Sequence, residues 1–208
     1  MPVLQIDLSA NRRSRQAKLK LKEKHSLEAV SVIAIDPGGT NGWSLMVLPP
    51  EALSDPNEKI LTNIEIHQHG EVSTYLGRNG VDGEAIAVDD IWSLLKCWPD
   101  AAIVMEDFIL QQKRKDRDLL SPVRVTAALS YLIWKDNRVW FKQSPADAKN
   151  VATDDRLRRW GLYSSEGGLQ HARDADRHAI LFLRKAKMDY QVRADIWPWL
   201  YGKGAPYA

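Results

Sequence analysis

Two carboxylates lie at the ends of short apolar runs in this chain. Asp36 follows Val32-Ile33-Ala34-Ile35, and Glu106 follows Ala101-Ala102-Ile103-Val104-Met105, runs typical of strands buried on both faces. A carboxylate in such a place is costly to desolvate without a compensating group, and the Pro37-Gly38-Gly39 turn lets backbone or a ligand approach closely. The pattern favours cation or phosphate chemistry beside Asp36, although an Asp that only caps a turn would leave the same pattern.

A third group of polar residues lies at the start of the last expected helix. His171 and Asp174 are three residues apart and His178 follows four residues later, so the three share one helix face near the positive end of the helix dipole. Asp176 points elsewhere. A surface helix can carry such a mixture for solubility alone. Together with two strand-end carboxylates that repel each other without a divalent cation, the group predicts a metal site.

The elements that must position these residues form a hairpin meander followed by alternating helices and strands. Apolar periodicity and turn residues predict strands over 30–35, 42–48, 63–73, 101–105 and 137–142, and helices over 82–98, 123–135, 145–160 and 171–188. The first hairpin is expected to turn at Asn41-Gly42, and Ser121-Pro122 to begin the second helix. This order predicts a mixed α/β sheet whose sites form outside the carboxyl ends of the central strands, where Asp36 and Glu106 lie.

Length and composition predict one domain with tails. The chain has 208 residues, enough for a single α/β core, and we expect a flexible arm over 1–26, a domain over 27–190 and a C-terminal tail over 191–208. With 44% hydrophobic and 27% charged residues it resembles ordinary soluble proteins, and no membrane span or signal peptide is expected, which favours a cytoplasmic location. The single cysteine, Cys97, excludes an internal disulfide and a cysteine-based zinc site.

Positive charge is concentrated in two segments although the formal net charge is only +2. One segment is the expected arm, and the other follows the second carboxylate. Local basic segments favour polyanion binding, although a solvated tail has the same composition. The basic residues are Arg12, Arg13, Arg15, Lys18, Lys20, Lys22 and Lys24 in the arm, and Lys113, Arg114, Lys115 and Arg117 in the second segment.

Five short motifs in this order resemble the RuvC family of Holliday-junction resolvases, within the RNase H-like fold. They are Ile35-Asp36-Pro37-Gly38, Met105-Glu106-Asp107-Phe108, Lys142-Gln143, Ala148-Lys149 and His171-x-x-Asp174-Ala175. The resemblance spans residues 30–187 and implies a mixed five-stranded sheet with strand order 3-2-1-4-5 and helices on both faces. The long arm, the basic loop over 111–118, and His171 where many members carry Asp are departures that look like a phage-type member.

The resemblance implies a metal-dependent endonuclease that cuts four-way and other branched DNA. Two Mg²⁺ or Mn²⁺ ions roughly 4 Å apart would activate a water and stabilise the leaving oxygen. Asp36 would bridge both ions, Glu106 and Asp174 would each hold one, and His171 would be a further ligand or orient the attacking water. The residues implied to contact DNA phosphates are Lys113, Arg114, Lys115, Arg117, Lys142 and Lys149.

Each of two other features of the chain has two interpretations, one as packing and one as function. The helix over 123–135, with Tyr131 and Trp134, is either a homodimer interface, as a two-fold junction would require, or part of the core. Phe108 is either a base-stacking wedge or a packing residue, and packing is the preferred interpretation.

Three rival functions remain open. The turn over 36–42 also looks like the phosphate turn of actin-like sugar kinases, but 208 residues leave no room for the second domain those enzymes need. An RNase H acting on RNA/DNA hybrids has the same scaffold. A catalytically inactive DNA-binding module is disfavoured by the intact carboxylates.

Overall fold

The computed structural model describes residues 29–75, 80–108, 117–164 and 169–201. Its strands are β1 (Val30–Asp36), β2 (Thr40–Leu48), β3 (Ile66–Ser73), β4 (Ala102–Glu106) and β5 (Trp140–Gln143). Its helices are α2 (Glu51–Ser54), η1 (Ile60–Thr62), α3 (Gly80–Cys97), α4 (Arg117–Lys135), α5 (Pro145–Val151), α6 (Asp154–Arg159), α7 (Gln170–Met188), α8 (Tyr190–Ile196) and η2 (Pro198–Tyr201).

The strands form one mixed sheet in the order β3-β2-β1-β4-β5, which confirms the predicted order. β1 pairs antiparallel with β2, and β2 with β3, whereas β4 runs parallel to both β1 and β5. In this register Ile35 lies beside Met105, so Asp36 and Glu106 end two adjacent parallel strands. The carboxyl edge predicted from the apolar runs therefore exists.

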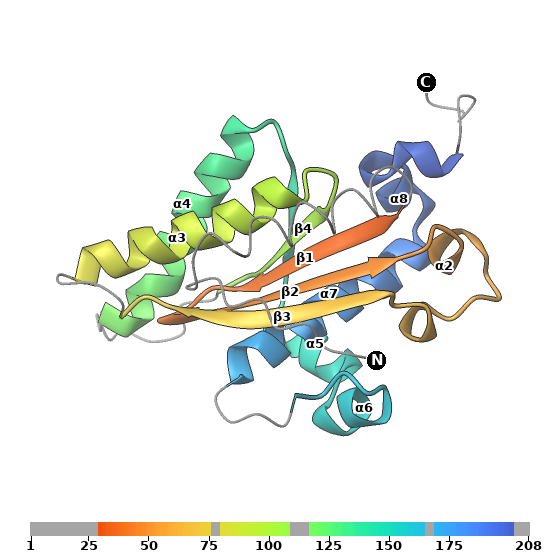
Figure 1. The fold of residues 1–208 in the computed structure, drawn as a ribbon, viewed down its shortest axis with the longest axis horizontal. Helices are drawn as coiled ribbons and strands as arrows, with labels where there is room; N and C mark the ends of the chain where they lie inside the picture. The colour runs from red at the N-terminus through yellow and green to blue at the C-terminus, as the bar shows by residue number, and fades with distance from the viewer. Residues whose placement is uncertain (1–28, 76–79, 109–116, 165–168, 202–208) are drawn as a thin grey trace, which may run out of the picture.

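Helices cover both faces of the sheet, as predicted (Figure 1). Successive side chains of a strand point to opposite faces of the sheet. On one face, Ile33 and Ile35 of β1 pack in a cluster with Leu94 of α3 and Leu129 of α4. The alternate residues of β1 face α7. On that second face Val32 and Ala34 belong to a separate core cluster with residues of α7 and α8. Because both faces of β1 and β4 are covered, these strands are apolar except for Ser31 and the carboxylates at their ends, Asp36 and Glu106.

The first turn differs from the prediction. Asn41 and Gly42 lie inside β2, and the chain reverses at 37–39 instead. The Asn41 side chain accepts a hydrogen bond from Gly38 N (3.0 Å) and donates one to the Val72 carbonyl (3.2 Å). Asn41 thus stabilises the turn from its place in β2. An Asn-Gly pair in the sequence does not show whether the Asn is part of a turn or binds to one nearby.

Two helix boundaries also differ from the prediction. α4 begins at Arg117, and Pro122 lies inside it. Ser121, expected to cap this helix, instead lies within it and donates its hydroxyl to the Gly38 carbonyl (3.4 Å). Pro122 is the sixth residue of α4, past its first turn, so the helix lacks one i→i−4 hydrogen bond at this point.

The helix predicted over 145–160 is two helices, α5 and α6. The chain leaves the first helix at Ala152, which has φ −126° and ψ 73°, and Thr153 caps the second by accepting from Arg156 N. The Ala152 carbonyl accepts a hydrogen bond from Nε of Arg177 (2.9 Å). This tertiary contact, invisible to local periodicity, explains the break.

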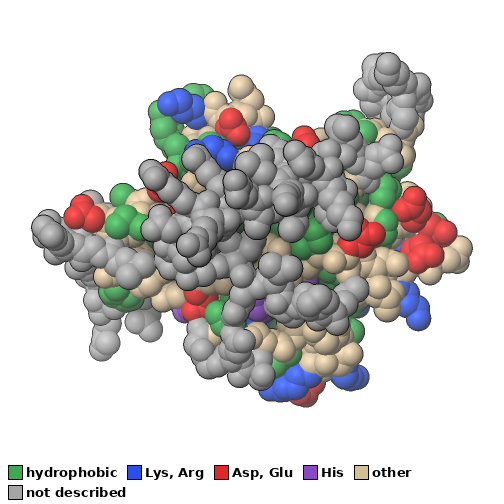
Figure 2. Space-filling view, in the orientation of Figure 1, with side chains coloured by type: hydrophobic (Ala, Val, Ile, Leu, Met, Phe, Trp, Pro, Cys, Tyr) green, Lys and Arg blue, Asp and Glu red, His purple; other side chains and the backbone are tan. Residues whose placement is uncertain are grey.

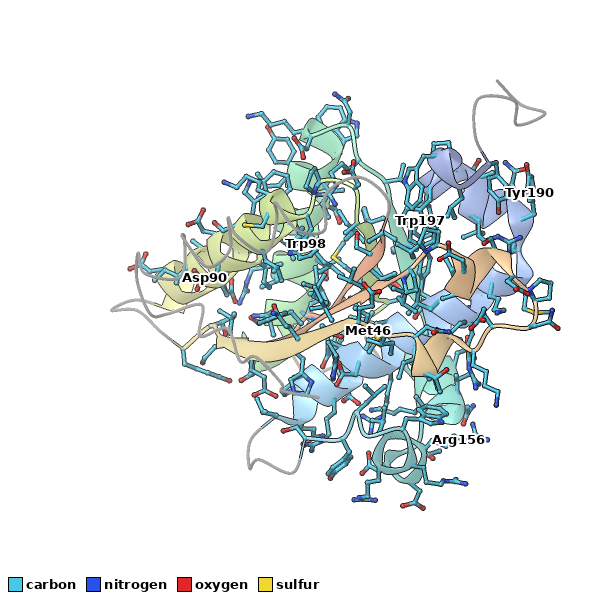
Figure 3. The ribbon with its side chains drawn as sticks, turned by 45° about the vertical axis from the view of Figure 1, so that its right-hand side comes forward. Met46, Asp90, Trp98, Arg156, Tyr190 and Trp197 are labelled. Carbon is cyan, nitrogen blue, oxygen red and sulfur yellow. The ribbon has the colours of Figure 1, made fainter. Side chains whose placement is uncertain are left out.

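The chain continues past the predicted end of the domain at residue 190. α8 and η2 follow, and Trp197 is fully buried with its ring 6.3 Å from that of Phe182 in α7 (Figure 3). Residues up to 201 thus pack on the sheet domain, whereas the predicted arm over 1–26 lies outside the described residues. Within the described ranges, no helix is both long and apolar enough to cross a membrane.

Candidate active site

Asp36 is the buried carboxylate at the centre of the predicted site. It ends β1, and its Oδ2 lies 2.9 Å from Nδ1 of His171 at the start of α7. Burial raises the pKa of Asp36, the His171 hydrogen bond opposes that rise, and the charges of Glu106 and Asp174 add to it. Asp36 is therefore near enough to Glu106 and to Asp174 for their negative charges to repel it.

His171 is the partly exposed member of this group. Its hydrogen bond to Asp36 raises the pKa of the imidazole, burial opposes that, and the charges of Asp36, Glu71 and Asp174 raise it further. The imidazole is thereby biased towards its charged form and compensates part of the negative charge around Asp36.

Glu106 is held by a buried histidine that lies two turns further along α7. Nε2 of His178 lies 3.0 Å from Oε2 of Glu106. The Gln143 amide is satisfied when its nitrogen donates to Nδ1 (3.1 Å) and to the carbonyl (3.0 Å) of His178. Nδ1 is then an acceptor, so Nε2 carries the proton and donates it to Glu106. The sequence placed His178 only on the same helix face as His171 and Asp174. In the structure it orients the carboxylate of Glu106.

Asp174 lies in an ionic network with the helices that cover this face. Its carboxylate accepts from Arg177, which also donates to Asp154 of α6, and lies 3.7 Å from Nζ of Lys149 in α5. Lys149 was predicted to neutralise phosphate, and it is exposed beside Asp174. The guanidinium of Arg177 is buried and fixes Asp174 relative to α5 and α6.

The start of α7 is placed by residues of the meander. Oε1 of Glu71, in β3, accepts from the backbone N–H of His171 (2.7 Å) and Ala172 (3.3 Å), so it caps a helix whose own N-cap residue, Leu169, makes no side-chain bond. A Cβ on Gly42 would lie 2.0 Å from the His171 carbonyl oxygen. The absence of a side chain at Gly42 lets the helix end approach the sheet.

Of the other residues predicted to contact DNA, Lys142 and Arg117 lie in described elements and three fall outside the described residues. Lys142 is exposed on β5, with Nζ 3.3 Å from Asp107 and 5.6 Å from the Trp140 ring centroid. Arg117 begins α4, and Lys113, Arg114 and Lys115 fall in the segment over 109–116, which is not described.

The structure brings Asp36, Glu106, His171 and Asp174 to one edge, but each carboxylate points to its own partner. The described residues hold a different group of potential metal ligands whose ligand atoms all lie within 4.8 Å of one another: His67, His69 and Asp176. Sequence reasoning missed this group and Glu71. The alternation His-Gln-His-Gly-Glu over 67–71 was the available signal, since it places His67, His69 and Glu71 on one face of a strand.

Comparison with known proteins identifies the fold. No protein-family model and no curated protein sequence matches the chain. Two solved structures do: T. thermophilus RuvC in complex with a Holliday junction substrate (16% identity, TM-score 0.57) and Thermus thermophilus RuvC (13% identity, TM-score 0.56), each match covering 76% of this chain and 96% of the other. At these identities the likeness establishes a shared fold, and the RuvC resemblance predicted from the motifs is confirmed at that level.

Proposed function

We propose that this chain is a divalent-metal-dependent endonuclease that cuts four-way DNA junctions. The observation that carries the proposal is the group of three carboxylates and one imidazole at the edge formed by β1, β4 and the start of α7. The fold shared with RuvC, one structure of which is a complex with a Holliday junction substrate, supports the choice of DNA substrate.

The residues of this group fit Mg²⁺ or Mn²⁺. Oxygen ligands are what these hard cations prefer, and Asp36, Glu106 and Asp174 supply them. Asp36 is buried and its pKa is raised by burial and by its carboxylate neighbours, so it lies where a cation would relieve the repulsion. Asp36, at the centre of the group, would contribute to holding both ions, and Glu106 and Asp174 would each help to hold one.

The chain's own residues then have distinct tasks. When bound, Mg²⁺ would provide activation of a water and stabilisation of the leaving oxygen of the phosphodiester. His171 uses Nδ1 for Asp36, so it exchanges a proton with water or a phosphate oxygen at Nε2. His178 keeps Glu106 in its orientation through Nε2–H, and Arg177 does the same for Asp174. Lys149, exposed beside Asp174, neutralises the phosphate.

A basic surface next to the site supports nucleic-acid binding. In the orientation of Figure 1, Lys and Arg side chains gather over α6, whereas Asp and Glu gather over α2 (Figure 2). The last turn of α6 carries Arg156, Arg158 and Arg159. α6 is tied through Asp154 and Arg177 to Asp174, so DNA phosphates held there would lie close to the metal ligands. Lys142 and the segment 113–117 are proposed to extend this surface.

We place a homodimer contact on α4. One face of this helix packs in the core through Val125, Leu129 and Ile133, which supports the packing interpretation for that face. On its other side Tyr131 and Trp134 are 58% and 71% exposed. Large exposed apolar side chains on one stripe fit a second copy of the chain, and a four-way junction offers two equivalent strands to two such sites.

The test compares five synthetic substrates. Purified full-length protein with Mg²⁺ or Mn²⁺ is expected to convert a four-way junction into two nicked, ligatable duplexes and to leave linear duplex mostly intact. Three-way and fork substrates are expected to be cut more slowly. Faster degradation of an RNA/DNA hybrid, or full activity of a monomer in analytical ultracentrifugation, would contradict the resolvase assignment and leave an RNase H-like nuclease.

A further inference from the structure

A second cluster of potential metal ligands lies between β3 and α7. Nε2 of His67 lies 2.7 Å from Oδ1 of Asp176, and Nδ1 of His69 lies 2.7 Å from Oδ2 of the same carboxylate. The two imidazoles are arranged edge to face, with ring centroids 4.9 Å apart. One potential ligand atom from each of the three residues therefore lies within 4.8 Å of the others.

The backbone explains this convergence. His67 and His69 are two residues apart on β3, so both point to the same face of the sheet, the face covered by α7 (Figure 1). They pair with Met46 and Ser44 on β2, and Met46 belongs to the core cluster of that face (Figure 3). Asp176 is two residues after Asp174 on the helix, so it faces a different direction from the proposed active site.

The charge in this cluster requires compensation. The Asp176 side chain is fully buried, and His69 and His67 are 4% and 12% exposed. The hydrogen bonds that the structure gives Asp176 come from these two imidazoles, and within the described ranges no Lys or Arg forms an ion pair with it. A buried carboxylate is retained only when it is paired or bound to a metal.

We propose that His67, His69 and Asp176 bind one transition-metal ion of the Zn²⁺ class, distinct from the ions of the nuclease site. The ligands would be Nε2 of His67, Nδ1 of His69 and a carboxylate oxygen of Asp176, a set of two nitrogens and one oxygen. This set suits Zn²⁺ or Co²⁺, whereas Mg²⁺ prefers oxygen alone. Three protein ligands leave a position for water, and His67 is the ligand that reaches the surface.

The ion would act as a clamp between the edge strand and the helix that carries the nuclease residues. Asp176 lies on the same helix as His171 and Asp174, and Glu71 on the same strand caps the start of that helix. Binding an ion at 67, 69 and 176 therefore strengthens a contact that already positions His171. The ion takes no part in the cleavage step.

The experiment titrates chelator-treated, full-length protein with Co²⁺ in excess Mg²⁺ and follows the visible absorption of the cobalt. We expect about one Co²⁺ per chain with absorption typical of a four-coordinate site, displaced by Zn²⁺. Asp36→Asn, the matched control in the nuclease site, is expected to retain this binding. His67→Gln and Asp176→Asn are expected to weaken it by more than about tenfold.

A thermal measurement keeps the result interpretable if a variant folds poorly. Zn²⁺ should raise the unfolding midpoint of the wild type and of Asp36→Asn but not that of His67→Gln, the mildest substitution because His67 is partly exposed. Absence of Co²⁺ absorption in the wild type, or its loss in Asp36→Asn with retention in His67→Gln, would overturn the proposal. Cleavage by Mg²⁺ alone is measured separately, so failure of one proposal does not imply failure of the other.

Discussion

Asp36 is the side chain on which the proposed chemistry depends most, because its buried carboxylate is adjacent to two others. Asp36→Asn removes the charge without changing the volume. We expect junction cleavage to fall by at least about a thousandfold, equivalent to ~4 kcal/mol of transition-state stabilisation, with junction binding unchanged or slightly tighter. Cleavage and gel-shift assays measure the two effects.

The control for this substitution is Asp100→Asn, an exposed carboxylate before the opposite end of β4. It should cleave like the wild type. Wild-type cleavage by Asp36→Asn in Mg²⁺ would eliminate Asp36 as a metal ligand, and with it the proposed site.

Asp36→Asn, which should lower cleavage, is expected to raise the stability of the metal-free protein. The pKa of Asp36 is raised on folding, so its favourable contribution is complete below the ordinary carboxyl pKa of about 3.9 and is lost as pH rises through the raised value. At pH 7 the ionised group is therefore destabilising, and Asp36→Asn should melt at a higher temperature than wild type in a chelator.

The difference in melting temperature should shrink as pH falls below about 4, where Asp36 is protonated in both states. Excess Mg²⁺ should stabilise the wild type more than the variant. A lower melting temperature of Asp36→Asn at pH 7 in chelator would show that the bond to His171 outweighs the cost of burial.

At this scale the sequence reveals a residue's type but not the group that faces it. Asp36 and Glu106 could be predicted because an apolar run that ends in a carboxylate is visible locally. His178 facing Glu106, and Glu71 capping α7, depend on contacts between residues 72 and 100 positions apart, which no local pattern contains.

At the scale of elements, α7 adds His171 and Asp174 to the two carboxylates at the strand ends. Its start approaches β2 so closely that a methyl group at Gly42 would meet the His171 carbonyl. The helix cannot keep this position if the glycine gains a side chain.

Gly42→Ala is therefore expected to displace the start of α7 and with it His171 and Asp174. A displacement of about 1 Å lowers cleavage by about a hundredfold, and overpacking costs about 1–3 kcal/mol of stability. Turnover per folded molecule and chemical unfolding measure the two quantities.

Gly161→Ala is the matched control, since Gly161 has φ +70° and a Cβ there would meet nothing within 4 Å. It should lose about 1 kcal/mol of stability through backbone strain while keeping wild-type turnover. Equal turnover of the two variants would mean that the approach at Gly42 does not position the site.

Element types and their order were predictable from periodicity, whereas several boundaries were not. The break between α5 and α6 follows from Arg177 binding the Ala152 carbonyl, and Ser121 serves the turn at Gly38. In the first case a distant side chain takes a backbone carbonyl that local rules assign to a helix, and in the second a side chain expected to cap its own helix donates to a distant turn instead.

At the scale of the whole molecule, the basic N-terminal residues are the part of the predicted DNA-binding surface that can be tested without the structure. Seven Lys and Arg against one Glu lie between residues 11 and 24. If they bind phosphates, deleting residues 1–26 should weaken binding about equally for all DNA sequences. The slope of log affinity against log salt should become flatter by about 0.9 for each duplex phosphate that the arm neutralises.

Affinities measured by fluorescence anisotropy at several salt concentrations give this slope. The control is a variant with residues 1–26 kept and its Lys and Arg changed to Gln, which should behave like the deletion. An unchanged slope would identify the arm as a solvated tail.

The meander followed by alternating elements predicted a mixed sheet, whereas the order of its strands was predicted through the resemblance to the RuvC family. The packing of α8 and Trp197 on the domain was not, since a short aromatic-rich segment after a helix has no periodicity that distinguishes it from a tail. Whether two copies meet at α4 is likewise a property of the surface, which the hydrophobic pattern of the core does not encode.

The site draws its residues from β1, β4 and α7, and this has a consequence for the order in which the chain folds. The β1–β2 hairpin is local, whereas Asp36 and His171 meet across 135 residues, so the loop-closure entropy of the last contact is the largest in the site. During synthesis the N-terminal strands emerge first, and the helix that completes the site emerges last. A nascent or truncated chain that ends before residue 170 has Asp36 and Glu106 but lacks His171 and Asp174, so the proposed cleavage centre can form only after α7 has been synthesised.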